Sequence, residues 1–287
     1  MPAPRLPRRD LAEAVEARVG ELIASTPTGG GTVSVHVSGL DGEVLLDREP
    51  EAVHYAASTM KVPLVVAAYR RHDRGEVALD ADVAVHNRFA SAWDGSPYSL
   101  DQADDQDDWT WDRVGRCVSL RTLAEHALVR SGNLATNLVL ERVGVDEVAA
   151  VLADAGCSPA TQVARGIEDR AAACAGLNNL VTAPDLAQVL LGVAGRSLAS
   201  EASCTEVEDV LTRQQHRDGI PAGLPAGTYV ANKTGWVQGI SHDMALVRPE
   251  DRPPYVIVVL TSVDVPECDG QSFIADLSRI VWEAWQS

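Results

Sequence analysis

The chain has 287 residues, of which 46% are hydrophobic, which is enough to bury a sizeable core and excludes a disordered protein. Acidic residues outnumber basic ones by 41 to 24, and the formal charge of −17 argues against nucleic acid or an anionic membrane surface as a partner. No apolar stretch approaches the roughly 18 residues of a membrane span. The basic N-terminus lacks the apolar region of a signal peptide, so we expect a soluble protein, cytoplasmic as the sequence stands and secreted if a leader was removed.

The predicted elements run from a helix to a hairpin, through a helical middle, and back to strands and a last helix. Apolar residues at helical spacing predict the first helix over 9–23, and alternation on either side of an Asp41-Gly42 turn predicts the hairpin. The other expected ranges are 32–38 and 43–47 for the hairpin strands, 58–72, 119–131, 134–142, 145–155 and 183–194 for the middle helices, 228–234, 241–248 and 255–262 for the later strands, and 273–285 for the last helix.

This order predicts an α/β fold of the α+β type, in which the two ends of the chain form an antiparallel sheet flanked by the N- and C-terminal helices. A large all-helical subdomain is inserted between them. We expect one domain over 1–287, with an α/β subdomain at about 1–57 and 214–287 and a helical subdomain at about 58–213. An acidic insert occupies about 86–115.

Lysine is rare in this chain. Of the 24 basic residues, 22 are arginine and only Lys61 and Lys233 are lysine. A lysine amine can lose its charge near neutral pH, whereas a guanidinium cannot, so the two positions are candidates for proton-transfer chemistry. Drift in codon usage is the alternative explanation.

Ser58 and Lys61 lie one turn apart at the start of a predicted helix, which places the amine on the same face as the hydroxyl. A serine oxygen is a weak nucleophile until a base takes its proton, and a desolvated lysine beside another cation can act as that base. The helix N-terminus also offers N–H groups to an oxyanion. Surface helices produce the same spacing without any chemistry.

A second candidate motif is Ser131-Gly132-Asn133, between two predicted helices. Ser131 can pass a proton to a leaving group, and Asn133 can hold a substrate amide. The same three residues also suit a turn followed by a helix cap. Both interpretations stay open from the sequence.

A third candidate motif is Lys233-Thr234-Gly235-Trp236, at the end of a predicted strand. Lys233 would supply positive charge and Thr234 a hydroxyl for a substrate carboxylate. Gly235 would let a substrate lie against the strand edge. An ordinary strand end is the alternative.

The three motifs occur in the order Ser-x-x-Lys, Ser-x-Asn, Lys-Thr-Gly, and on these residues the sequence resembles the class A β-lactamase-like serine hydrolases. The resemblance covers nearly the whole chain and implies a β-lactamase or transpeptidase-like fold with no metal and no cofactor. It implies a small-molecule substrate that carries a carboxylate. The implied roles are Ser58 as nucleophile, Lys61 as proton acceptor, Ser131 as proton shuttle, Asn133 as substrate binder, Lys233 and Thr234 as carboxylate anchor, and the N–H groups of Ser58 and Trp236 as oxyanion hole.

Two departures from the family pattern matter. Gly132 stands where these β-lactamases usually have Asp. The family's Glu-x-x-Leu-Asn run, whose Glu positions the deacylating water, is missing, although Glu168 lies close to the expected place. Glu168 is either a replacement base or, as we favour, one half of an ion pair with Arg165 or Arg170 that pins the loop. Slow turnover of the acyl-enzyme is therefore expected.

Two further features have competing interpretations. The acidic run at 101–112 lacks the glycine and terminal Glu of a calcium loop, so we interpret it as a solvated insert near the site. His242-Asp243 suggests a Ser-His-Asp triad, but a Gly-x-Ser-x-Gly elbow is missing and we interpret the histidine as structural. Three functions remain: a β-lactam hydrolase, an esterase, amidase or acyltransferase of secondary metabolism, and a catalytically silent penicillin-binding protein.

Overall fold

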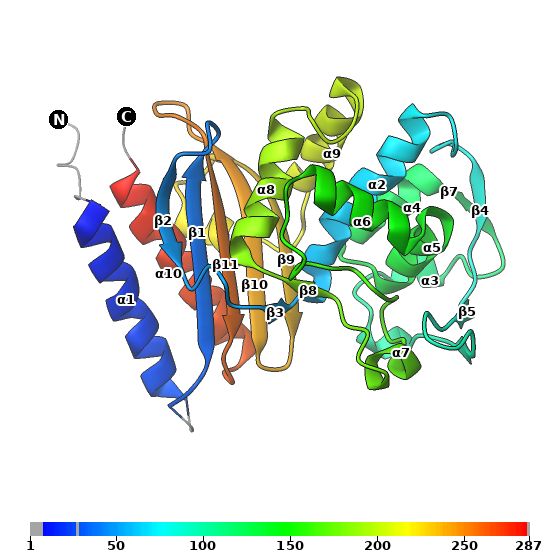
Figure 1. Cartoon of the computed structure of the whole chain (residues 1–287), viewed down its shortest axis with the longest axis horizontal. Helices are drawn as coiled ribbons and strands as arrows, with labels where there is room; N and C mark the ends of the chain where they lie inside the picture. Colours follow the sequence, from blue (N-terminus) through cyan, green and yellow to red (C-terminus); the bar gives the residue numbers. More distant parts are fainter. Residues whose placement is uncertain (1–7, 27–28, 286–287) are drawn as a thin grey trace.

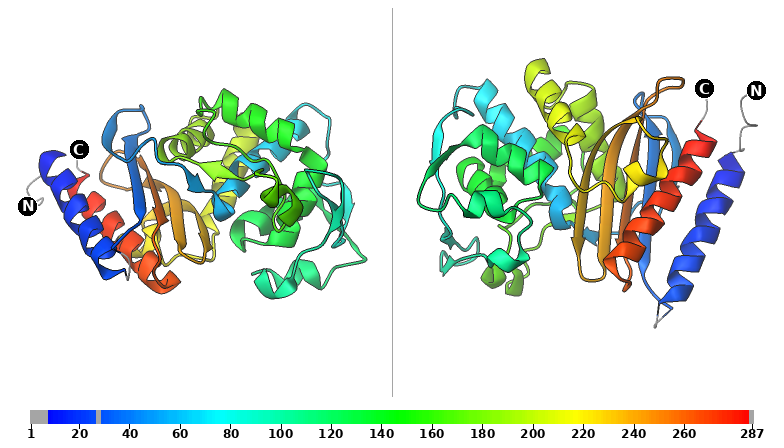
Figure 2. Two further views of the ribbon diagram at one scale, coloured as in Figure 1. Left: turned by 60° about the horizontal axis from the view of Figure 1, so that its bottom comes forward. Right: turned by 180° about the vertical axis from the view of Figure 1, so that it is seen from behind.

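The computed structural model describes residues 8–26 and 29–285, and its elements form a sheet with helices on both faces (Figure 1). Two long helices cover one face, and a larger helical part lies against the other (Figure 2). Within the described residues, no helix combines the length and the apolar character needed to cross a bilayer. This arrangement confirms the predicted fold class.

The sheet has five antiparallel strands in the order β2-β1-β11-β10-β9. Its first and last segments meet directly, since β1 pairs with β11 with Val35 opposite Val259. In β11, Val258 faces the helical part and Val259 faces the two long helices, so both faces of the sheet are buried. The bounds are β1 (Thr32–Gly39), β2 (Val44–Arg48), β9 (Tyr229–Val237), β10 (Ile240–Arg248) and β11 (Tyr255–Ser262).

The two long helices are α1 (Arg8–Ser25) and α10 (Glu267–Ala284), which lie side by side on the sheet (Figure 1). In α1, the apolar residues predicted to face the core, among them Leu11 and Val15, are buried. The last helix begins six residues before its predicted start. Pro266 precedes the helix, and its first turn carries Glu267 and Asp269. These acidic side chains stabilise the N-terminus of the helix through its dipole, a signal that the apolar periodicity does not contain.

The helical part is built around α2 (Lys61–Asp73), which is buried from Lys61 to Tyr69, as expected for a helix that is apolar on all sides. The other helices are α3 (Asp108–Trp111), α4 (Leu120–Val129), α5 (Asn133–Val143), α6 (Val145–Asp154), α7 (Arg170–Cys174), α8 (Ala183–Ala194) and α9 (Glu201–Thr212), and the 3₁₀ turns are η1 (Ala57–Met60), η2 (Gln102–Asp104) and η3 (Ile220–Gly223).

Three local features differ from the sequence prediction. The helix expected over 58–72 begins as the 3₁₀ turn η1, and α9 is not among the predicted helices. The part expected to be all helical also contains short strand pairs, which close the loops between helices. Two pairs lie within this part, β4 (Asp82–Ala84) with β7 (Cys117–Ser119) and β5 (Phe89–Ala90) with β6 (Pro97–Tyr98). In a third pair, β8 (Leu180–Val181) pairs with β3 (His54–Tyr55), which lies just before this part in the chain.

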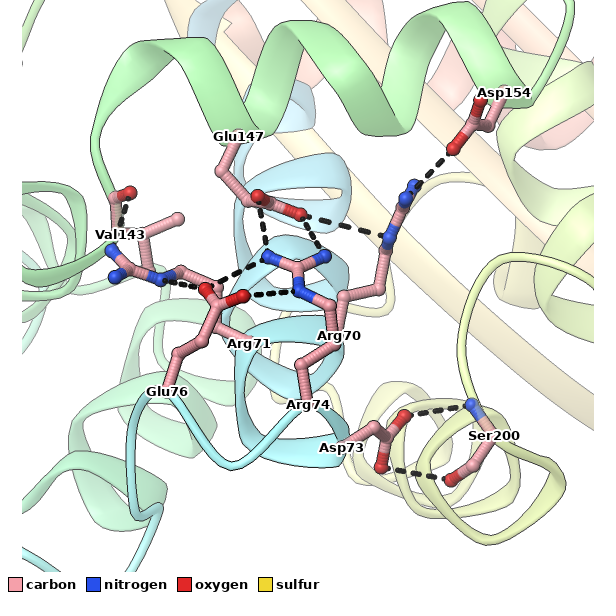
Figure 3. Close-up of polar contacts among 9 residues, drawn as sticks. All are labelled: Arg70, Arg71, Asp73, Arg74, Glu76, Val143, Glu147, Asp154 and Ser200. Carbon is pink, nitrogen blue, oxygen red and sulfur yellow. Dashed lines mark hydrogen bonds and ion pairs between the residues drawn. The ribbon is translucent and has the colours of Figure 1, made fainter.

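Ion pairs fix the C-terminal end of α2 (Figure 3). Arg74 donates paired hydrogen bonds to Glu147 of α6 at 2.9 and 2.7 Å and to Glu76 at 2.7 and 3.0 Å. Asp73 accepts from the N–H and the hydroxyl of Ser200, at the start of α9, at 2.7 and 2.9 Å. The paired bonds from Arg74 to two carboxylates suit the planar guanidinium of arginine better than the amine of lysine. They tie α2 to its neighbours, and its other end begins the candidate site.

Candidate active site

Ser58 lies in the 3₁₀ turn η1, half-buried and lining a cleft between β9 and the helical part. Lys61, the first residue of α2, is fully buried. Residues three apart eclipse in a 3₁₀ helix, so the two side chains leave the same side of the chain. Ala57, just before Ser58, has a φ of +44°, which is uncommon for a residue with a side chain and is typical of strained functional turns.

The amine of Lys61 reaches across to the second motif. Its Nζ donates to Ser131 O at 2.7 Å, to Asn133 Oδ1 at 2.9 Å and to Ser131 Oγ at 3.4 Å. In the described part of the chain, no hydrogen bond joins Lys61 to the Ser58 hydroxyl, although we expect the amine to point at it. The hydrogen bonds of the amine therefore lead to Ser131 and Asn133 of the second motif.

Lys233 approaches the same serine from the sheet. Its Nζ donates to Ser131 Oγ at 3.0 Å and to the Thr234 carbonyl at 2.8 Å. The Ser131 hydroxyl therefore lies between the two lysine amines of the chain, which are 172 positions apart in sequence. The motif occupies the second half of β9 rather than its end, because the strand continues to Val237.

Burial changes the acidity of both amines. It lowers the pKa of Lys61 to about 7, against the opposing effect of the Asp105 and Asp107 carboxylates. Burial, together with the nearby Lys61, also lowers the pKa of Lys233 well below its usual range. Lys61 is therefore partly neutral near pH 7, as a general base for a serine must be.

Close contact between β9 and η1 depends on Gly235. A Cβ built on it would lie 2.9 Å from the Ser58 nitrogen and 3.1 Å from that of Thr59, so a side chain there would push the strand away from Ser58. Thr234 Oγ1 is buried and has no hydrogen-bond partner among the described residues, which leaves it available to a ligand. Trp236 follows and lines the cleft.

The cleft has a volume of about 520 Å³ and brings together predicted site residues from all three motifs. Ser58, Ser131, Asn133 and Trp236 line it directly, and Glu168 lines it from the loop before α7. Lys61, Lys233, Thr234 and Gly235 lie buried behind this lining. A small molecule fits a space of this size.

Glu168 does not form the ion pair that we favour from the sequence, so that interpretation is wrong. Its Oε2 accepts the Asp101 N–H at 2.9 Å, while its Oε1 is buried with no partner in the described structure. Arg165 instead donates to the Leu177 carbonyl at 3.0 Å. Burial raises the pKa of Glu168, and nearby Asp104 adds to this effect.

Asp169, rather than Glu168, pins the loop. Its carboxylate accepts from Ser91 Oγ and from the Ala92 N–H, both at 2.7 Å, and from the Ala172 N–H at 3.0 Å at the start of α7. The loop is therefore held by one acidic residue while its neighbour faces the cleft.

His242 is structural, as expected. Its Nε2–H donates to the Tyr55 carbonyl at 2.9 Å, its Nδ1 accepts the Thr261 N–H at 3.1 Å, and burial lowers its pKa to about 4. Asp243 accepts the Ile220 N–H at 2.8 Å instead of orienting the imidazole. The histidine supports the chain just before Ser58, and the pair does not form a Ser-His-Asp triad.

The acidic insert is only partly solvated, contrary to the expectation. Asp107 is fully buried, and Trp111 Nε1–H donates to Asp105 at 2.8 Å. Trp109 stacks on His126 with ring centroids 4.2 Å apart. The insert is thus packed beside the second motif. Sequence reasoning missed this role, for which Gly132 in place of the usual Asp is the signal in the sequence.

The buried amine of Lys61 should lower the stability of the fold. A pKa of about 7 in place of 10.5 corresponds to a destabilisation of the folded state by about 4 kcal/mol at pH 7. A substitution that removes the amine regains only part of this free energy, because it leaves the hydrogen-bond acceptors of Lys61 unpaired. We expect Lys61→Met to raise the free energy of unfolding by about 2 kcal/mol at pH 6. The folded pKa is lowered, so this penalty is complete below about pH 7 and vanishes as the pH rises to 10.5. Thermal melts at pH 6 and pH 10 test it, and a lower melting temperature for the variant at pH 6 would contradict it.

The fold and the order of the three motifs place the chain in the β-lactamase-like class of proteins. The model of the Beta-lactamase enzyme family matches residues 14–285, and the chain belongs to this family.

Individual relatives are distant. A β-lactamase of Amycolatopsis lactamdurans is 29% identical over 190 residues, which cover 64% of this chain and only 62% of that relative. A solved variant of the class A β-lactamase of the last common ancestor of Gram-negative bacteria superposes with a TM-score of 0.78 at 26% identity, covering 94% of this chain and 98% of the other. PBP-A has a TM-score of 0.78 at 22% identity over 99% and 98% of the two chains, a likeness of fold.

Proposed function

We propose that the protein hydrolyses a β-lactam, or a related amide or ester with a carboxylate, through an acyl-enzyme on Ser58. The observation that carries the proposal is the Ser131 hydroxyl between the amines of Lys61 and Lys233, beside Ser58 in one cleft. A site that only binds a ligand has no need of a lysine that is partly neutral.

In this mechanism the neutral amine of Lys61 takes the Ser58 proton as the oxygen attacks the substrate carbonyl. The N–H groups of Ser58 and Trp236 stabilise the resulting oxyanion. Ser131 then gives its proton to the leaving nitrogen and regains one from Lys61, whose Nζ lies 3.4 Å from its oxygen. The C–N bond breaks, and the acyl group stays on Ser58.

Substrate orientation falls to the residues around the reacting centre. Lys233, whose charged form a bound carboxylate favours, and the unpaired hydroxyl of Thr234 would bind the carboxylate. Asn133, half-buried in the lining of the cleft, would bind the amide side chain. Glu168 is the carboxylate placed to activate water for deacylation. The family match and the β-lactamase relatives favour a β-lactam over the esterase, acyltransferase and silent-binder alternatives.

We expect penicillin G to add one acyl group per chain, and Ser58→Ala to remove the adduct entirely, because in the proposed mechanism Ser58 is the nucleophile and Ser131 only passes protons. Penicillin G is a suitable probe because a variant of PBP-A has been solved as its acyl-enzyme complex. Intact mass and hydrolysis of a chromogenic cephalosporin give the readouts. Ser197→Ala, at an exposed serine that is not part of the cleft lining, is the matched control. An adduct of unchanged mass on Ser58→Ala would overturn the assignment.

A further inference from the structure

The second motif is supported from outside by the acidic insert. Asp105 Oδ1 accepts the Asn133 N–H at 2.8 Å, and its Oδ2 accepts the Leu134 N–H at 2.8 Å. These are the first N–H groups of α5, whose preceding residue Gly132 has no side chain with which to cap them. Asp105 therefore caps a helix that lies 28 residues further along the chain.

Asp107 occupies the space that a side chain at position 132 would need. A Cβ built on Gly132 would lie 2.9 Å from Asp107 Cβ and 3.0 Å from Asp107 Oδ2. The carboxylate is fully buried and accepts from His126 Nδ1–H at 2.8 Å and from the Thr110 hydroxyl. Although burial alone would raise it, these hydrogen bonds keep the pKa of Asp107 below its ordinary value.

We infer that Asp105 and Asp107 are positioning residues, which together support the second motif from the acidic insert and hold Ser131 and Asn133 against Lys61. The inference rests on the proposed function. Neither aspartate touches the reacting atoms; both act through the motif that they support.

The geometry of the motif requires such support. Ser131 has a φ of +59°, a strained conformation for a residue with a side chain, which persists only where the surroundings enforce it. The amide of Asn133 is oriented at both ends, because its Nδ2 donates to the Asp104 carbonyl at 3.0 Å and its Oδ1 accepts from Lys61. The insert therefore sets where the Lys61 acceptors lie.

The same carboxylates face Lys61 electrostatically. Asp105 and Asp107 favour the charged form of Lys61. Two further titratable groups interact electrostatically with its amine: Lys233 on β9 and His216 before η3. Removing a carboxylate therefore lowers the pKa of Lys61 further. Because the neutral amine is the base, the acidic limb of the acylation rate then moves to lower pH.

An exchange of side chains tests the spatial claim. Gly132→Asp alone is expected to slow acylation by penicillin G at least 100-fold, because the new side chain meets Asp107. Combining it with Asp107→Gly should restore at least tenfold, since the carboxylate returns to the same space from the other chain segment. Circular dichroism shows whether each variant is folded. A double variant that is no faster than Gly132→Asp overturns the claim.

Asp105→Asn tests the positioning role with a side chain of nearly the same shape that lacks the negative charge. We expect slower acylation together with an acidic limb shifted to lower pH, whereas purely structural damage lowers the rate at every pH equally. Asp108→Asn, an exposed aspartate of the same insert, is the charge-matched control and should leave the limb in place. An unshifted limb in Asp105→Asn contradicts the inference. If the unmodified chain forms no adduct on Ser58, it is the proposed function that fails.

Discussion

Lys61→Arg is expected to slow acylation of Ser58 about as much as Lys61→Ala, by about 10²–10⁴-fold, the usual contribution of a general base. The lysine can act because burial lowers its pKa to about 7, so that a large share of the amine is neutral at physiological pH. A guanidinium keeps its charge at any accessible pH and cannot accept the proton. In the unmodified chain, acylation should rise with pH through about 7 and then level off.

Lys233→Arg is the comparison for this prediction. Position 233 serves a substrate carboxylate, which arginine also binds, so the loss should fall mainly on KM and be smaller than at position 61. Some loss is expected because Lys233 is fully buried and the guanidinium is larger. Stopped-flow acylation with penicillin G over pH 5–9 measures both. Equal losses in the rate of acylation for the two arginine variants would contradict the assigned roles.

Much of the architecture could be predicted from local pattern. The strand over 255–262 and the helix over 183–194 have the bounds expected from the sequence, because an apolar run between turn residues and a capped amphipathic stretch are local signals. The start of α10 was missed because acidic first-turn residues, not apolar periodicity, set it. No residue pattern distinguishes the 3₁₀ turn at Ser58 from the first turn of an α-helix, so the sequence predicts a helix there.

For the site, the order of motifs identifies which residues matter but not how they contact one another. The sequence places Lys61 next to Ser58, whereas its hydrogen bonds lead to Ser131 and Asn133, which are brought near only by packing of α2 against α5. The burial of Asp107 is likewise a tertiary effect. An acidic run in the sequence suggests a solvated segment. The missing side chain at Gly132 is the one sign in the sequence of the space that the Asp107 carboxylate occupies.

Glu168→Gln is expected to slow deacylation by about 10²–10⁴-fold while leaving the acylation of Ser58 by penicillin G within a few-fold of the unmodified rate. The carboxylate lines the same cleft as Ser58, and its buried Oε1 has no hydrogen-bond partner among the described residues. A water admitted to the cleft with the substrate would give its proton to this oxygen. Glutamine keeps the shape but cannot take that proton. Since burial raises the pKa of Glu168, deacylation should decline on acidification at a higher pH than an ordinary glutamate gives.

Even with Glu168 in place, deacylation should be slow, and a burst of about one equivalent should precede turnover. The family's Glu-x-x-Leu-Asn run provides an amide four residues after the Glu, but that position here is Ala172, which is buried in α7 and cannot hold a water. The second oxygen of Glu168 is also committed to the Asp101 N–H. One oxygen of Glu168 is therefore left to activate the water.

Rapid-quench mass spectrometry with penicillin G separates the two steps, and Glu141→Gln, at an exposed glutamate paired with His86, controls for the lost charge. We expect the adduct to persist for minutes in the unmodified chain and longer still in Glu168→Gln. Turnover at many cycles per second without a burst would contradict slow deacylation. Unchanged decay of the adduct in Glu168→Gln would instead show that another group activates the water and that the Glu168 carboxylate takes no part in deacylation.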